Sequence, residues 1–247
     1  MNKTAIIIPS RLKAERFPNK PLKLINKKEM ILHVYDAAKN SKAGDVYVAT
    51  PDQEIAQLVT KYGGSAIITS NEHQTGTDRI YEVFNKFLNN NPNIIVNLQG
   101  DMPNIDPKVI KDLILYMEKG KCDIGTLISK FNSIEELQDQ NAVKAIVKEK
   151  MDVGKFCNVL DFIRTKPQTS YNLYHHIGIY AFTNKALLRY VNLERSKLEI
   201  ERNLEQLRAM ENNMSIHAGY VNSLPLSVDT EKDFLEIKKV MEKNDKN

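Results

Sequence analysis

The sequence predicts an α/β fold with a central, mostly parallel sheet, helices on both faces and an antiparallel extension. In the first 120 residues, short β-branched runs alternate with longer stretches of helical spacing. Such alternation is typical of parallel strands joined by helical crossovers. After residue 120, strand-like runs follow one another with irregular polar segments between them, and the final third returns to helical spacing.

The first half contains four predicted strands and four predicted helices. Met30, Val34 and Ala38 lie on one apolar face of the first helix. The glycine pair at 63–64 closes the second helix, because glycine adopts the left-handed cap at no steric cost. The strands are expected at 4–8, 45–49, 65–69 and 93–98, and the later helices at 52–62, 78–88 and 109–117.

The second half is predicted to extend the sheet and then to end in helices. Four strands are expected at 122–128, 142–147, 156–162 and 176–182, with a short one near 215–218. Helices are expected at 184–192, 197–212 and 231–243. No repeat, low-complexity linker or clear boundary interrupts the chain, so we expect residues 1–247 to form a single domain.

Composition and charge limit the class of protein. The 247 residues are 42% hydrophobic and 27% charged, the balance of a globular protein with a substantial core. The net charge of +4 is too small and too evenly spread to favour a nucleic-acid partner. Cys122 and Cys157 are expected to be reduced, packed thiols, and the first residues match neither a signal peptide nor a membrane span. We therefore expect a cytoplasmic protein without a membrane partner.

A basic loop follows the first strand, at the sheet edge where open α/β sheets bind ligands. Four cations, Arg11, Lys13, Arg16 and Lys20, fall within ten residues, a pattern that favours a triphosphate. The loop is neither a Walker A motif nor a dinucleotide turn, because no glycine occurs before position 44. The plainer interpretation is a solvated basic loop. Residues 73–79 are also open to two interpretations: a helix start capped by Thr77 or Asp78, or polar groups that reach a nucleotide.

Two aspartates are candidates for a magnesium site. Asp101 follows the fourth strand directly after Gly100, and Asp229 precedes the last helix. Carboxylate oxygens are preferred ligands of Mg²⁺. The plainer interpretations are a cap or turn residue for Asp101 and a helix N-cap for Asp229. His175 and His176 are adjacent on a predicted strand and point to opposite faces, which disfavours zinc.

Together these segments resemble the family of 3-deoxy-manno-octulosonate cytidylyltransferases, also called CMP-Kdo synthetases. The resemblance extends from Ala5 to about Lys238 and is carried by the ordered motifs IIIPSR…R.P.KPL, VATPDQEI, HQTGTDR, IVNLQGD.P, HHIGIYAF, LEQLR and SVDT..D. It implies a Rossmann-like nucleotide-diphospho-sugar transferase fold. It also implies that residues from about 122 to 215 contribute the sugar-acid and dimerisation part.

The resemblance further implies roles for individual residues. Arg11, Lys20, Asp101 and Asp229 match the catalytic positions, with the two aspartates as Mg²⁺ ligands. The positions that match nucleotide-binding residues are Ser10, Arg11, Lys20, Thr75, Gly76, Arg79 and Gln99. Those that match sugar-acid contacts are Gln99, Arg164, His176, Tyr180, Glu205 and Gln206.

The chain departs from the family pattern at three places. Asn19 stands where the family usually has glycine before the matching lysine, and asparagine also tolerates left-handed backbone. Met102 replaces an acidic residue beside the metal position. Asp161 and Ile163 replace the usual tyrosine and serine before Arg164, and the stretch that follows is shorter. The last departure bears on the sugar pocket more than on the nucleotide pocket.

The activity implied by the resemblance is transfer of a cytidylyl group from CTP to 3-deoxy-manno-octulosonate (Kdo), with release of diphosphate. CMP-Kdo serves lipopolysaccharide assembly, and family members are typically homodimers that use the region from Val191 to Met210. Two alternatives stay open from the sequence. One is the same chemistry on an 8-amino Kdo or a nonulosonic acid; the other is a protein that binds CTP without catalysis.

Overall fold

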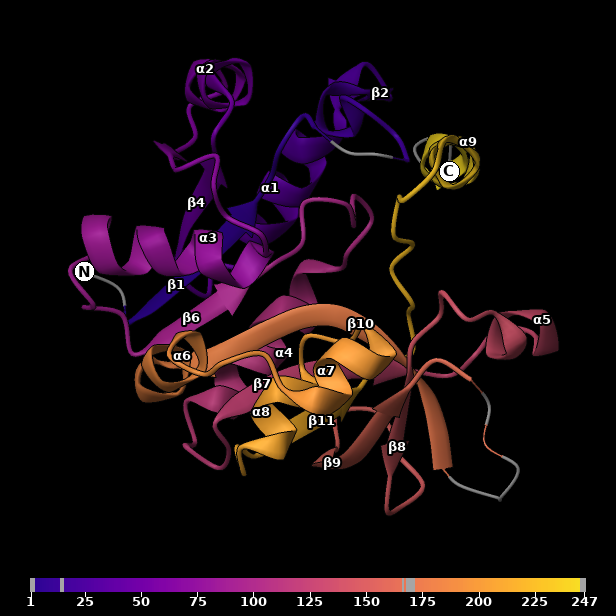
Figure 1. The fold of residues 1–247 in the computed structure, drawn as a ribbon. Helices are drawn as coiled ribbons and strands as arrows, with labels where there is room; N and C mark the ends of the chain where they lie inside the picture. Colours follow the sequence, from indigo (N-terminus) through magenta and orange to yellow (C-terminus); the bar gives the residue numbers. More distant parts are fainter. Residues whose placement is uncertain (1–2, 14–15, 166, 168–171, 245–247) are drawn as a thin grey trace. The chain divides into compact units, whose positions relative to one another are not determined.

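The computed structural model describes residues 3–13, 16–165, 167 and 172–244, and Figure 1 traces their elements along the chain. The chain divides into two compact units. The first contains residues up to 111 together with those from 225 onward, and the second contains residues 112–224. The single-domain interpretation of residues 1–247 stays a prediction.

The first unit contains four parallel strands in the order β5-β4-β1-β6. β1 spans Thr4–Pro9, β4 Asp45–Thr50, β5 Ala66–Ile68 and β6 Ile94–Asn97. Ile6 of β1 pairs with Val46 on one side and Val96 on the other, and all three side chains are buried. The four predicted strands are thereby confirmed, because uninterrupted runs of Ile and Val suit strands covered on both faces.

The helices of the first unit begin near their predicted positions. α1 spans Met30–Asn40, α2 Gln53–Lys61 and α3 Gly76–Glu82; α4, Pro107–Met117, carries the chain from the first unit into the second. α2 ends before Gly63, whose φ of 84° is the left-handed cap predicted from the glycine pair. The predicted helix 78–88 is two elements, because a π-helical turn, Val83–Phe87, follows α3.

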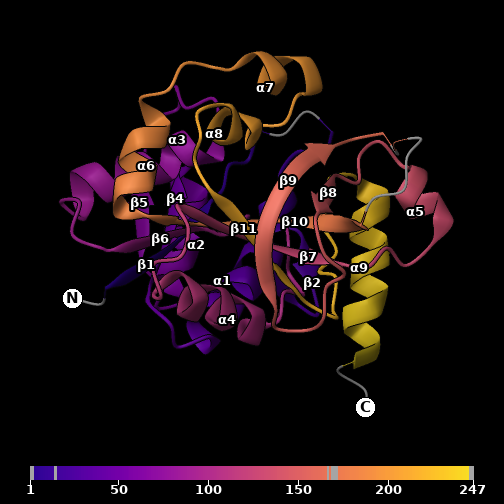
Figure 2. The same ribbon diagram turned by 90° about the horizontal axis from the view of Figure 1, so that it is seen from below.

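Between β1 and α1, the structure adds small elements that no periodicity indicates. A 3₁₀ turn, Lys20–Leu22, precedes the hairpin of β2, Leu24–Ile25, and β3, Lys28–Glu29. The last helix, α9, Glu231–Asn244, returns to this unit and lies beside β2 (Figure 2). Its Phe234 and Ile237 join a core cluster with Phe17, Ile25, Met30 and Val228. The C-terminal segment is therefore an integral part of the first unit.

The second unit contains the predicted antiparallel extension. Its strands lie in the order β10-β7-β11-β9-β8, and β8 also pairs with β10. β7 spans Ile124–Ser129, β8 Lys144–Val147, β9 Phe156–Ile163, β10 Asn172–Thr183 and β11 Ile216–Tyr220. Among the described residues of this unit, β11 and β7 pair in parallel and the other pairings are antiparallel.

The helices of the second unit correct one prediction. α5 spans Ile134–Gln138, α6 Asn184–Val191, α7 Lys197–Arg202 and α8 Leu207–Glu211. The single helix predicted over 197–212 is wrong, since the chain breaks at Asn203, whose φ of 52° is left-handed. Every described helix is too short or too polar to cross a bilayer.

Candidate active site

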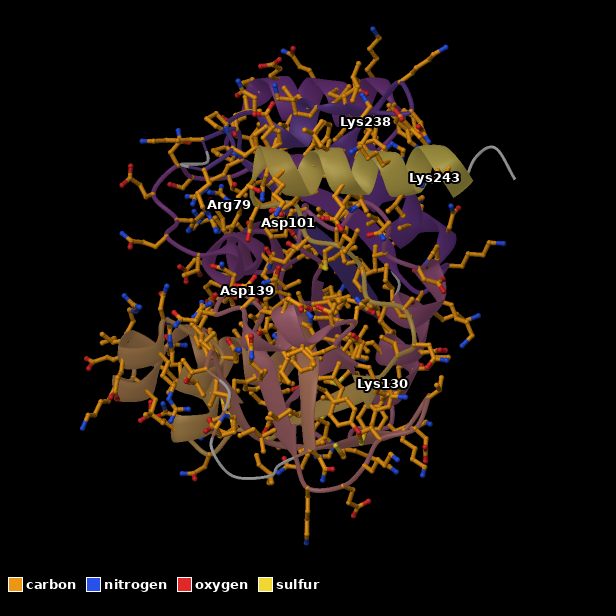
Figure 3. The ribbon with its side chains drawn as sticks, turned by 90° about the vertical axis from the view of Figure 1, so that its right-hand side faces the viewer. Arg79, Asp101, Lys130, Asp139, Lys238 and Lys243 are labelled. Atoms are coloured by element: carbon orange, nitrogen blue, oxygen red, sulfur yellow. The ribbon has the colours of Figure 1, made fainter. Side chains whose placement is uncertain are left out.

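A pocket of about 730 Å³ lies in the first unit, at the carboxyl ends of its parallel strands. This volume is within the range of small-molecule sites. Three loops and one later residue contribute to its wall. The lining includes Pro9–Arg11, Lys13, Arg16, Lys20 and Pro21 after β1, Asn71, His73–Gly76 and Arg79 after β5, Gln99–Asp101 after β6, and Asp229. Arg79 and Asp101 are labelled in Figure 3.

Lys20 brings the two candidate metal ligands together. Its Nζ lies 3.0 Å from Asp101 Oδ2 and 3.6 Å from Asp229 Oδ1. The same ammonium donates a hydrogen bond of 2.7 Å to the carbonyl oxygen of Val228. Arg16 pairs with the other oxygen of Asp229 at 3.1 Å. Asp101 and Asp229 are 128 positions apart in the sequence, yet both carboxylates reach one cation.

Local backbone features hold the two aspartates in place. At Gly100, a Cβ atom would lie 3.1 Å from the carbonyl oxygen of Pro9, so glycine permits the close approach of the two strand ends. The N–H of Val228 donates to the carbonyl oxygen of Asp101 at 2.9 Å. This bond fixes the segment before α9 against the end of β6.

The N-cap interpretation of Asp229 is wrong. Thr230 occupies that position: the N–H of Asp233 donates to Thr230 Oγ1 at 3.3 Å, and the N–H of Thr230 donates to the Asp233 carboxylate at 2.8 Å. This reciprocal pattern is a capping box. Because Thr230 and Asp233 satisfy the helix end, the Asp229 carboxylate lines the pocket instead.

The chemistry of this pair fits a hard divalent cation. Two carboxylates already converge on a positive charge, and carboxylate oxygens are suited to Mg²⁺. Within the described ranges, no group of three acidic, histidine or cysteine side chains is arranged to hold a metal. A magnesium ion here would therefore take its remaining oxygens from water and phosphate, as Mg²⁺ at nucleotide sites commonly does.

The basic loop is fixed at both ends. The N–H of Leu12 donates to the Asp52 carboxylate at 2.8 Å, and the N–H of Asn19 donates to the carbonyl oxygen of Leu12 at 3.0 Å. Asn19 has a left-handed φ of 57°, a conformation that asparagine tolerates. The hydroxyl of Ser10 is buried and has no hydrogen-bond partner within the described structure. An unpaired buried hydroxyl on a pocket wall is suited to a polar ligand.

The segment after β5 forms the opposite rim of the pocket and begins α3. Thr75 is the N-cap: its hydroxyl accepts from the N–H of Asp78 at 3.1 Å, and the Asp78 carboxylate accepts from the N–H of Thr75 at 3.2 Å. The predicted caps, Thr77 and Asp78, are therefore wrong, although Asp78 completes the box. At Gly76, an added Cβ would lie 3.3 Å from the Pro9 ring and 3.5 Å from Gln99 Nε2.

Arg79 and Gln99 are held from behind the pocket wall. The Arg79 guanidinium is buried and donates to Thr69 Oγ1 at 2.5 Å and to the carbonyl oxygen of Ser70 at 2.9 Å. Burial, and then the positive charge of Arg11, lower the pKa of Arg79 from its usual value. Gln99 donates to Asn97 Oδ1 at 3.1 Å. Both side chains are thus fixed without a ligand.

The remaining predicted contacts lie in the second unit, where two of them form an aromatic cluster. His176 Nε2 lies 2.9 Å from Thr126 Oγ1, and its ring packs edge-on against Phe162. Burial lowers the pKa of His176 to about 3, so the ring is neutral at pH 7. The ring of Tyr180 lies 5.4 Å from that of His176, and burial raises the pKa of its hydroxyl well above the usual value.

Arg164, Glu205 and Gln206 lie around the turn between α7 and α8. The Arg164 guanidinium donates to the carbonyl oxygens of Arg202, Gln140 and Asn203 at 3.0–3.1 Å. Glu205 accepts from the hydroxyl of Tyr190 at 3.2 Å, and Gln206 is buried. Arg164 therefore fixes the turn that carries Glu205 and Gln206.

Comparison with known proteins gives the family. A family profile described as cytidylyltransferase matches residues 5–216. A 3-deoxy-manno-octulosonate cytidylyltransferase from Brucella ovis is 43% identical over 233 residues, which cover 94% of this chain and 92% of the relative. The protein of the same name from Bartonella henselae is 41% identical over 238 residues, 96% of this chain and 97% of the relative. The chain belongs to the 3-deoxy-manno-octulosonate cytidylyltransferase family.

A solved structure supports the same assignment. The chain is similar to CMP:2-keto-3-deoxy-manno-octonic acid synthetase complexed with CTP, with a TM-score of 0.89 and 33% identity. The match covers 98% of this chain and 100% of that structure. The predicted family and the nucleotide-diphospho-sugar transferase fold are thereby confirmed, and the chain is a cytidylyltransferase.

The sequence did not indicate every side chain that lines the pocket of this cytidylyltransferase. His73, Gln74 and Asn71 belong to the wall, although only the motif that contains the first two was singled out. Asp52 lies behind the wall and holds the basic loop through Leu12. A signal existed for Asp52, because it lies in the loop after β4 at the ligand-bearing edge of the sheet, as Asp101 lies in the loop after β6.

Proposed function

We propose that this chain couples CTP to Kdo and releases diphosphate. The observation that carries the proposal is the convergence of Asp101, Asp229 and the cations of the basic loop on one pocket. In the reaction, the anomeric hydroxyl oxygen of the sugar acid forms a bond to the α-phosphorus of CTP while the bond to the departing diphosphate breaks. The hydroxyl proton is lost to solvent. The protein's task is to position the reactants and to stabilise negative charge.

The nucleotide would bind between the basic loop and the rim after β5. Arg11 and Lys20 supply positive charge for the phosphates, and Ser10 offers its unpaired hydroxyl. Thr75, Gly76, Arg79 and Gln99 complete the proposed nucleotide site. Gly76 lets the start of α3 pack closely against β1, because a Cβ atom there would lie 3.3 Å from the Pro9 ring.

Asp101 and Asp229 are the residues that would hold Mg²⁺. The ion, when bound, would neutralise phosphate charge and lower the pKa of the attacking hydroxyl. Lys20 and Arg16 pair with these carboxylates in the protein described here, so both acids are already ordered and charge-compensated. Lys20 can also donate to a phosphate oxygen, because its ammonium has three hydrogens.

The sugar acid is proposed to contact Gln99 and the second-unit residues Arg164, His176, Tyr180, Glu205 and Gln206. Arg164 retains guanidinium hydrogens beyond those donated to backbone carbonyls, and a carboxylate is a natural partner for them. We further propose a cytoplasmic homodimer that supplies CMP-Kdo for lipopolysaccharide assembly. These proposals rest on membership of the family.

Release of diphosphate from CTP with Kdo and Mg²⁺ tests the proposal. Asp101→Asn should lose about a hundredfold or more in rate, because removing one transition-state stabiliser costs about 2.7–4 kcal/mol. Asp106→Asn is the matched control: this exposed carboxylate accepts from the N–H of Lys108 at 2.8 Å, and asparagine can replace it there. Equal rates in wild type and Asp101→Asn would remove Asp101 from the reaction.

A panel of acceptors separates this function from the two alternatives. Kdo should be the best substrate among Kdo, 8-amino Kdo and a nonulosonic acid. A faster reaction with another acid would reassign the sugar while leaving the nucleotide chemistry in place. If CTP raises the melting temperature but no acid supports turnover, the chain is a CTP-binding protein without catalysis.

A further inference from the structure

Glu82 holds the pocket rim after β5 from the side away from the cavity. Its Oε2 accepts from the N–H of Ser70 at 2.9 Å and lies 2.6 Å from His73 Nε2. Its Oε1 accepts from Lys86 at 3.1 Å. The carboxylate thus joins the end of α3 to two points of a segment that lines the site.

Glu82 is ionised at neutral pH. Burial by itself favours the neutral acid, but the hydrogen bonds from Ser70, His73 and Lys86 outweigh it and lower the pKa to about 2. A charged acceptor makes stronger hydrogen bonds than a neutral one. The attachment of the rim therefore persists throughout the physiological pH range.

Glu82 and His73 differ in their relation to the cavity. His73 lines the pocket, whereas Glu82 is absent from its wall. Glu82 is also the last residue of α3, directly before the π-helical turn Val83–Phe87. Such turns are frequent near functional sites because they redirect side chains from a regular helix. Any influence of Glu82 on a ligand therefore passes through the residues that it holds.

The carboxylate also selects the tautomer of the His73 ring. An ionised carboxylate only accepts hydrogen bonds, so Nε2 must carry the proton that it donates to Glu82. Nδ1, the other ring nitrogen, has no hydrogen-bond partner among the residues that the structure describes. The ring consequently offers one polar atom with unused capacity at the pocket wall.

We propose that Glu82 is a positioning residue for the nucleotide: it fixes Ser70 and His73, and it leaves His73 Nδ1 available to bound CTP. The identity of the nucleotide rests on the proposed function. Arg79 acts beside it, since its guanidinium holds Thr69 and the carbonyl oxygen of Ser70. When neutral, Nδ1 accepts a hydrogen bond from a nucleoside hydroxyl or amine. When protonated, it donates to a phosphate.

Steady-state kinetics test the positioning role. Glu82→Ala should raise KM for CTP about tenfold, because two hydrogen bonds to a charged group are lost from the rim. The KM for the sugar acid, measured at saturating CTP, should stay within about twofold. The hydrogen bonds that Glu82→Ala removes hold only Ser70 and His73 in the rim after β5. Glu82→Gln should recover most of the loss, because the amide oxygen still accepts from Ser70 and His73. Lys86→Ala is the matched control: it removes the exposed partner of Glu82 without touching the rim, and it should change neither KM.

Direct binding of CTP makes the test independent of turnover. Calorimetry should show weaker CTP binding by Glu82→Ala at a temperature well below the melting temperature of the variant. Nuclear magnetic resonance of protein labelled with ¹⁵N-histidine tests the contact itself. The Nδ1 resonance of His73 is assigned by its loss in His73→Asn, and CTP should shift it. The direction of the shift distinguishes a nitrogen that accepts a hydrogen bond from one that donates. If wild type binds CTP but does not turn over, the proposed function fails and the role of Glu82 is still decided.

Normal CTP affinity in folded Glu82→Ala, or equal increases in both KM values, overturns the proposal. If Glu82→Ala does not fold, His73→Ala and Glu82→Gln are combined instead. His73→Ala should weaken CTP binding about fivefold, and adding Glu82→Gln should change little, because the two residues act as one unit. Unchanged CTP binding by His73→Ala then contradicts the inference.

Discussion

The two carboxylates that line the pocket, those of Asp101 and Asp229, are each paired with a cation. Lys20 contacts both Asp101 and Asp229, and Arg16 takes the outer oxygen of Asp229. Two carboxylates converging without these cations would repel each other. Ser10 differs from these paired groups, because its buried hydroxyl has no hydrogen-bond partner within the described structure. The site therefore combines preformed ion pairs with one polar group whose hydrogen bond a ligand can supply.

The burial of His176 predicts how stability depends on pH. Its folded pKa is about 3, against an ordinary value of 6.5, and the rings of Phe162 and Tyr180, the hydroxyl of Thr126 and the neighbouring His175 surround it. Between these values, the unfolded chain binds a proton that the folded chain excludes. The free energy of unfolding should therefore fall as pH drops below 6.5, by up to about 1.4 kcal/mol per pH unit from this group.

Urea unfolding of wild type and His176→Gln at pH 7, 6 and 5 measures this contribution. Glutamine can still donate to Thr126 but does not titrate. The gap in unfolding free energy between the two proteins should narrow as pH falls, because only wild type loses stability through this position. A constant gap would contradict the burial effect.

At the scale of elements, the clearest surprise is the break between α7 and α8. The apolar residues Leu198, Leu204 and Leu207 continue a helical spacing through 197–212. Asparagine tolerates left-handed backbone, but it also occurs within helices, so Asn203 by itself does not mark the break. Arg164 satisfies the carbonyl oxygens exposed at the break, and Arg208 reaches back to Glu199 in α7. These long-range partners stabilise the break, and periodicity cannot indicate them.

The Glu199–Arg208 pair should be strongly coupled. Both side chains are buried, and the guanidinium donates to both carboxylate oxygens, at 2.6 and 2.8 Å. Arg208→Met should cost about 3–5 kcal/mol, because it leaves a buried carboxylate without its main partner. The double variant Glu199→Leu with Arg208→Met should be more stable than Arg208→Met alone. Chemical denaturation measures both, and simple additivity of the two single changes would show that the charges do not interact.

Much of the fold and of the site could be predicted from the sequence. Runs such as 4–8 and 94–97 are rich in Ile and Val, which indicates buried strands. Asp101 follows the second of these runs, so its place at the pocket edge of the sheet could be predicted. The hairpin 24–29 is not predicted, because its strands are too short to show alternating hydrophobicity. Helix α5 is not predicted either, because it buries no residue and so has no apolar face. The Thr75 cap was missed because Thr77 and Asp78 compete with it locally. The assigned ligand roles stay predictions.

For the whole molecule, the decisive feature is that the first unit is built from two distant segments of the chain. Residues up to 111 form the sheet and most of the pocket, and residues from 225 onward return with Asp229 and α9. Val228, Phe234 and Ile237 pack against Phe17, Ile25 and Met30. The core cluster and one wall of the pocket thus depend on the same C-terminal segment.

Two substitutions in α9 test this dependence. Ile237→Ala should lower the free energy of unfolding by about 2–5 kcal/mol, because the side chain is fully buried in the cluster. Leu235→Ala is the matched control on the same helix: its side chain is 51% exposed, and its loss should cost less than about 1 kcal/mol. Equal costs at the two positions would mean that α9 does not pack on the first unit through this face.

The split architecture also sets an order of events during synthesis. A nascent chain that has left the ribosome as far as residue 111 has its parallel strands but lacks Asp229, and the intervening 112–224 must be translated before that acid exists. Translation of residues 112–224 therefore delays Asp229 by about 6–23 s, at about 5–20 residues per second. Products that stall or terminate within residues 112–224 will carry the basic loop and Asp101 without Asp229.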